Sequence, residues 1–153
     1  MFKTVSTVVA ALACVALAAP SHAQSFSPSS GTVSGTGMVT LKQSVTITCA
    51  LSTPTISLTP TTAAITGQSI SPGSFLCGAF GTTFGAWSLA VVPGSTTLVD
   101  VTFGFSAGST CYGTTTAQWS NVTRRITFTN AVLPGPPSCT VSGYIDVPLL
   151  QIL

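Results

Sequence analysis

The stretch from Trp87 to Phe105, WSLAVVPGSTTLVDVTFGF, decides the fold. Residues 87–92 form a short apolar run, and residues 92–95 contain the Pro-Gly pair that is typical of a turn. Residues 97–105 then alternate between polar and apolar side chains, as in a half-buried strand. The side chains expected on its inner face are Val99, Val101, Phe103 and Phe105. Two such runs around a tight turn predict a β-hairpin.

Three further stretches, residues 44–51, 121–133 and 139–153, show the same period of two. The side chains expected to share one face are Val45, Ile47, Cys49 and Leu51 in the first stretch, Val122, Arg124, Ile126, Phe128 and Asn130 in the second, and Val141, Ile145, Val147 and Leu149 in the third. Pro148 suits an edge strand, because proline has no backbone N–H to donate to a neighbour. We therefore expect the third stretch at the edge of a sheet.

Short strands separated by turn signals are typical of all-β sandwiches and barrels. After residue 23, the sequence shows no helical period with caps at both ends. We expect a single-domain β-sandwich, Ig-like or jelly-roll-like, over residues 44–153. Residues 24–43, which are rich in Ser, Gly and Thr, are expected to form an extended arm before it.

The first 23 residues have the pattern of a bacterial secretory signal peptide. Lys3 supplies the positive start, residues 4–19 form the apolar run, and Ala23 ends a small-residue cleavage site. The apolar run is shorter than the roughly 20 residues that a membrane-spanning helix needs. We therefore expect a protein that is secreted to the medium or the cell surface, with no transmembrane segment in the mature chain.

Cleavage after Ala23 leaves four cysteines, Cys49, Cys77, Cys111 and Cys139. An even number in an exported chain indicates two disulfides, and four cysteines allow three pairings. Cys49 and Cys77 are separated by 28 positions, and so are Cys111 and Cys139. The equal spacing favours these two pairs.

Charged residues make up only 4% of the chain, there is no Glu, and the one histidine, His22, belongs to the signal. A nucleophilic site that relies on imidazole is therefore excluded from the mature chain. Asp100 and Asp146 are too few carboxylates for a calcium site, and cysteines held in disulfides cannot bind zinc. Four Lys and Arg residues are too few to neutralise a nucleic-acid backbone. We expect a non-enzymatic protein with no catalytic residue, no metal, no cofactor and no nucleic-acid partner.

Aromatic side chains offer one alternative function. Trp119 lies among polar neighbours and Tyr112 lies earlier in the same region, so the two could stack against a ligand. Trp87 lies in an apolar run and is expected in the core. An exposed pair formed by Trp119 and Tyr112 would make the protein a carbohydrate-binding module.

Four motifs carry a resemblance to a known family. They are Phe26-Ser27-Pro28, Val45-Thr46-Ile47-Thr48-Cys49, the segment 70–78 leading to Trp87, and Cys139-Thr140-Val141-Ser142-Gly143. With these motifs the chain resembles the bacterial protein activator of alkane oxidation family, also called PraB. The resemblance implies a secreted protein that promotes growth on alkanes by emulsifying hydrocarbon and that is associated with the cell surface or with biofilm. It implies no catalytic residue.

The composition is compatible with that role. A chain with 45% hydrophobic residues and few charges loses little ion hydration when it reaches an oil–water boundary. The expected partner is hydrocarbon or another apolar interface, and weak charge repulsion also favours self-association. A second alternative is a structural subunit of a surface fibre or biofilm matrix, in which the terminal strand, residues 141–153, pairs edge to edge with a neighbour.

Overall fold

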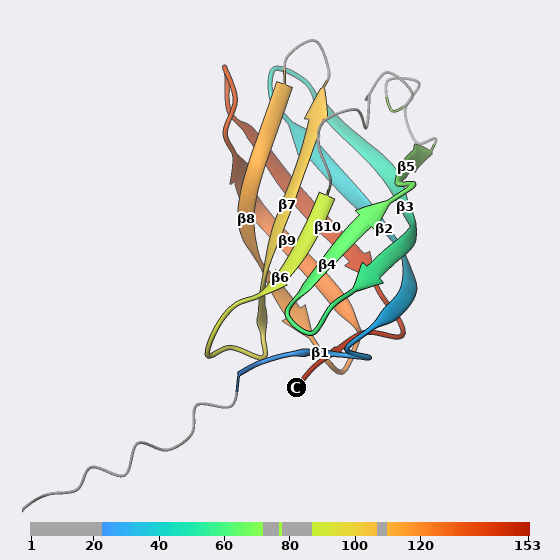
Figure 1. Cartoon of the computed structure of the whole chain (residues 1–153). Helices are drawn as coiled ribbons and strands as arrows, with labels where there is room; N and C mark the ends of the chain where they lie inside the picture. Colours follow the sequence, from blue (N-terminus) through green and yellow to red (C-terminus); the bar gives the residue numbers. More distant parts are fainter. Residues whose placement is uncertain (1–22, 72–76, 78–86, 107–109) are drawn as a thin grey trace, which may run out of the picture.

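The computed structural model describes residues 23–71, 77, 87–106 and 110–153, and β-strands dominate this part of the chain (Figure 1). The strands are β1 (Phe26–Ser27), β2 (Gly31–Lys42), β3 (Thr46–Leu58), β4 (Thr62–Thr66), β5 (Ser69–Ser71), β6 (Trp87–Val91), β7 (Leu98–Ser106), β8 (Thr110–Ser120), β9 (Arg125–Leu133), β10 (Cys139–Asp146) and β11 (Gln151–Ile152). The all-β prediction is confirmed.

The main sheet closes on itself. Its order is β2-β10-β9-β8-β7-β6-β4-β3, all neighbours are antiparallel, and β3 also pairs with β2. These eight strands therefore form a closed barrel, with β5 added beside one half of β3. The predicted sandwich is wrong. Alternation along a strand is the same in both architectures, and the difference lies in whether the two edges of the sheet pair with each other.

The strand that closes the barrel is β2, in residues that the sequence predicts as an arm. Val33, Val39 and Leu41 of β2 are buried in the core. Gly37 lies against β10 so closely that a Cβ there would overlap the carbonyl oxygen of Tyr144. The small side chains that make this segment look like a linker thus allow it to approach its neighbour.

The hairpin that decides the fold is present. β6 and β7 are antiparallel, with Val91 opposite Val99, and the turn between them contains Gly94 at φ 80°. All four side chains expected on the inner face of β7 are buried, namely Val99, Val101, Phe103 and Phe105. This part of the sequence prediction is confirmed residue by residue.

The alternation fails where a stretch runs into a turn. Val45 precedes β3, Val122 lies between β8 and β9, and Leu149 lies in the turn after β10, and all three are exposed. β10 is paired with β2 on one side and β9 on the other, so it is not an edge strand. Pro148 lies two positions after Asp146, the last residue of β10, in the turn that follows the strand.

The barrel has two different ends (Figure 1). At the terminal end, defined here by Ser25, Pro60, Asn121 and Leu153, β1 pairs with β11 and Ser25 exchanges backbone hydrogen bonds with Leu153. Phe26 of β1 is buried there. The opposite end carries the β2–β3 turn and the β9–β10 loop, which the Gln43 side chain joins by donating to the carbonyl oxygen of Pro137 at 2.7 Å.

Candidate functional site

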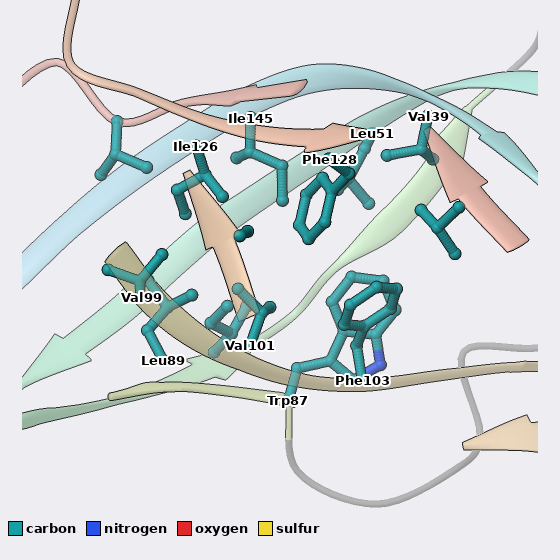
Figure 2. Close-up of a cluster of buried hydrophobic side chains, with 14 of the residues drawn as sticks. Val39, Leu51, Trp87, Leu89, Val99, Val101, Phe103, Ile126, Phe128 and Ile145 are labelled. Atoms are coloured by element: carbon teal, nitrogen blue, oxygen red, sulfur yellow. The ribbon is translucent and has the colours of Figure 1, made fainter. Parts of the chain in front are cut away.

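Buried hydrophobic side chains cluster in the interior of the barrel (Figure 2). One hollow in the core holds about 10 Å³, the space of roughly one water molecule. Its lining is entirely apolar and consists of Val39, Leu51, Trp87, Val101, Phe103, Phe105, Phe128 and Ile145. An eight-stranded barrel is just wide enough for its own side chains, and the core follows that rule. This hollow is too small for an alkane chain.

Aromatic rings hold the middle of this core in place. The Trp87 ring lies 5.6 Å from the Phe103 ring and 5.3 Å from the Phe105 ring, measured between centroids. Phe103 on β7 lies 5.4 Å from Phe128 on β9, in an edge-on arrangement that aromatic pairs prefer. A ligand could enter only by displacing these contacts.

The predicted stacking pair does not form. Both residues lie on β8, but Trp119 points inward and is 3% exposed, whereas Tyr112 points outward and is 43% exposed. The indole N–H of Trp119 donates to Asn121 at 2.7 Å, so its polar atom is already used. The two positions differ by an odd number of residues, which places them on opposite faces of a strand. Polar neighbours in the sequence were a misleading sign of exposure.

The two disulfides join Cys49 to Cys77 and Cys111 to Cys139, the pairing that the spacing favours. The first ties β3 to residue 77, and the second ties the start of β8 to the start of β10. All four cysteines are buried. Two disulfides indicate an oxidising compartment, such as the extracellular space.

The outer face of the barrel is polar and nearly uncharged. Threonine hydroxyls bond across strands, Thr40 to Thr48 at 2.8 Å and Thr102 to Thr114 at 2.7 Å. Asp100 on β7 accepts a hydrogen bond from Thr116 at 2.6 Å. Such pairs satisfy their own hydroxyl groups and leave a surface with little net charge.

The ion pair on this surface joins Arg125 to Asp146. The hydrogen bonds from Arg125 lower the pKa of the Asp146 carboxyl, and the same contact raises the pKa of Arg125. The Arg125 guanidinium also lies 3.8 Å from the centre of the Tyr144 ring. Asp146 is thus bound to a cation, and β8 and β9 lie between its strand and that of Asp100. The two carboxylates do not form a catalytic pair.

Large apolar side chains are exposed at both ends of the barrel and on its wall. They are Met38, Val45, Tyr112, Val122, Val132, Leu149 and Leu153. Val122 and Leu149 were expected to face inward, so the sequence analysis missed them. The signal that could have found them is their place beside turn residues, Val122 after Asn121 and Leu149 after Pro148.

No group of three or more His, Cys, Asp or Glu side chains could hold a metal ion in residues 23–71, 77, 87–106 and 110–153. Within the same residues, no helix has the length and hydropathy needed to cross a membrane.

Comparison with known proteins gives one match. A family model described as alkane oxidation protein activator PraA/PraB-like matches residues 1–151. No curated protein and no solved structure matches the chain.

Proposed function

Because the chain belongs to the PraA/PraB-like family of alkane oxidation protein activators, we propose that it is a secreted, non-enzymatic, surface-active protein that promotes growth on alkanes by emulsifying hydrocarbon. Its site of action is the outer surface of the barrel, and its partner is the boundary between liquid hydrocarbon and water.

One observation carries this proposal: the core hollow holds about 10 Å³ and is packed with aromatic rings. A carrier that encloses a hydrocarbon needs a cavity of several hundred Å³, on the order of 300 or more. Among the described residues the core is packed with side chains, which supports a role for the outer surface as the part that meets the oil.

The charge of the outer surface supports the same role. Arg125 and Asp146 neutralise each other, which leaves Lys42, Asp100 and Arg124 as the other charged side chains of the described residues. Moving a charge out of water is costly, whereas each apolar Å² removed from water gains about 25 cal/mol. A surface of threonine hydroxyls and scattered aliphatic groups therefore adsorbs with little loss of ion hydration.

Interfacial tension at a hexadecane–buffer boundary tests the proposal. The protein, with both disulfides formed, is titrated against a charged globular protein of equal size, because most proteins adsorb to some extent. A faster and deeper fall in tension than the control gives, with stable emulsions, is the expected result. A fall no greater than the control overturns the proposal. Electron microscopy would then test for fibres and a role as a structural subunit.

A further inference from the structure

The three most exposed large apolar side chains of the described residues all lie at the terminal end of the barrel. Val122 is 93% exposed, Leu149 is 67% exposed and Leu153 is 66% exposed. They belong to two segments, the turn between β8 and β9 and the residues that follow β10. We call these three side chains the aliphatic tip.

Hydrogen bonds hold the two segments side by side. The Asn121 side chain donates to the carbonyl oxygen of Ile152 at 2.7 Å and accepts from the N–H of Ile152 at 2.9 Å. The carbonyl oxygen of Arg124 accepts from the N–H of Val147 at 2.8 Å. Each member of the tip lies within two positions of one of these residues, so the two segments that carry the tip are fixed to one another.

The charged side chain closest to the tip in sequence is already engaged. The Arg124 guanidinium donates to the carbonyl oxygen of Leu150 at 2.8 Å. In the amide orientation that matches donors to acceptors, the Gln151 side-chain oxygen also accepts from Arg124. The guanidinium is therefore partly solvated by the protein itself, which lowers the cost of bringing this end to an apolar phase.

Phe26, Leu150 and Ile152 at the terminal end are buried, whereas the three side chains of the tip are exposed. The three side chains are therefore held in water in the absence of a partner, which is the arrangement expected of an apolar contact surface.

The area of the tip decides between two apolar partners. Three aliphatic side chains at this exposure offer on the order of 300 Å². A stable protein dimer buries about 800 Å² on each partner and needs a complementary shape. A liquid alkane adapts to any shape, so a small tip carried on turns is sufficient for it.

We propose that the aliphatic tip, Val122, Leu149 and Leu153, is the part of the molecule that enters liquid hydrocarbon first, so that the barrel stands on the oil surface on its terminal end. This inference rests on the proposed function and names the surface through which it acts. It orients the opposite end, with the β2–β3 turn and the β9–β10 loop, toward the water.

Two matched triple variants test the inference. The tip variant carries Val122→Thr, Leu149→Gln and Leu153→Gln. The control variant carries three apolar-to-polar changes at exposed positions outside the tip, Val45→Thr, Val132→Thr and Met38→Gln. Both are expressed from the full-length chain, and urea unfolding establishes that each keeps the stability of the wild type. The readout is the protein concentration that gives half of the maximal fall in hexadecane–buffer tension.

For the tip variant we expect this concentration to rise at least about tenfold, because the exposed apolar area that enters the oil is removed. For the control variant we expect a change within about twofold. Equal shifts in the two variants would overturn the orientation while leaving the proposed function intact. A wild type no more active than the charged globular control would instead overturn the proposed function.

A second measurement does not depend on the tip variant folding well. A polarity-sensitive fluorophore is attached to Val122→Cys in one protein and to Val45→Cys in another. On hexadecane droplets we expect a blue shift of the emission at position 122 and a much smaller one at position 45. A larger shift at position 45 would reverse the proposed orientation.

Discussion

Arg125 and Asp146 form a two-point ion pair on the outer face of the barrel, with Nε donating to Oδ1 at 2.6 Å and Nη2 donating to Oδ2 at 2.9 Å. The pair joins the first residue of β9 to the last residue of β10. Its hydrogen bonds lower the pKa of Asp146 from the ordinary value of 3.8. A lowered pKa in the folded state gives stability that is fully present above 3.8 and is lost as pH falls through the lowered value.

Replacing Asp146 by Asn should therefore destabilise the protein at pH 7 but not in strong acid. We expect the gap in unfolding free energy between wild type and Asp146→Asn to be constant above about pH 5 and to narrow as the pH falls below 3.8. Urea titrations at several pH values measure it. A gap that stays the same down to pH 2 would show that the carboxylate charge contributes nothing.

Closure of the barrel depends on Gly143. This residue has φ 128°, and a Cβ there would overlap the carbonyl oxygen of Met38 on β2. Gly94 also has a positive φ, 80°, but has open space around it. We expect Gly94→Ala to cost about 1–2 kcal/mol from backbone strain alone and Gly143→Ala about 3 kcal/mol or more. Urea unfolding compares them, and equal costs would contradict the close approach of β2 and β10.

We predict that the Asn121 side chain stabilises the terminal end of the barrel through its hydrogen bonds. It accepts from Trp119 and from Ile152 and donates to Ile152. Asn121→Ala removes all three bonds and should cost about 2–4 kcal/mol, whereas Asn121→Asp removes only the donor and should cost about 1–2 kcal/mol. Hydrogen exchange at the Ile152 amide should accelerate in the same order. Unchanged hydrogen exchange at the Ile152 amide in Asn121→Ala would contradict this stabilising role.

The two disulfides should contribute similar stability, because both close loops of 28 positions. The loop-entropy relation gives about 3–4 kcal/mol for each. Paired serine variants, Cys49→Ser with Cys77→Ser and Cys111→Ser with Cys139→Ser, compared by urea unfolding, check this. Costs that differ by more than about 2 kcal/mol would mean that native packing around one bridge matters more than chain entropy.

The local structure was easier to predict than the closure. Alternation identified β7 and its four buried side chains, because a period of two is a property of the strand itself. It did not identify β2 as a barrel strand, because Gly31, Gly35 and Gly37 interrupt its apolar positions. Gly35 and Gly37 lie close to the backbone of β10, which is far away in the sequence. A sandwich and a barrel therefore looked alike.

The candidate surface was only partly predictable. The low charge and the absence of histidine after residue 23 can be read from the sequence alone, and they argued against an active site that uses imidazole. The aliphatic tip was not foreseen, because Val122 and Leu149 fit the alternation of the neighbouring strands. Trp119 was predicted to be exposed because its neighbours in the sequence are polar. In the structure one of those neighbours, Asn121, uses its side chain to bond to Ile152.

The hydrogen bonds between Ser25 and Leu153 bring the beginning and the end of the described chain into contact. The two ends of the described chain are therefore close enough in space to be joined by a short linker. A circular permutant joined by a short linker from Leu153 to Gln24, and opened in the turn at residues 92–97, would retain every strand pairing described here. Because the Gly94 N–H donates to the Gln24 side chain at 2.6 Å, the new ends of such a permutant would lie at the same end of the barrel as the 153-to-24 junction.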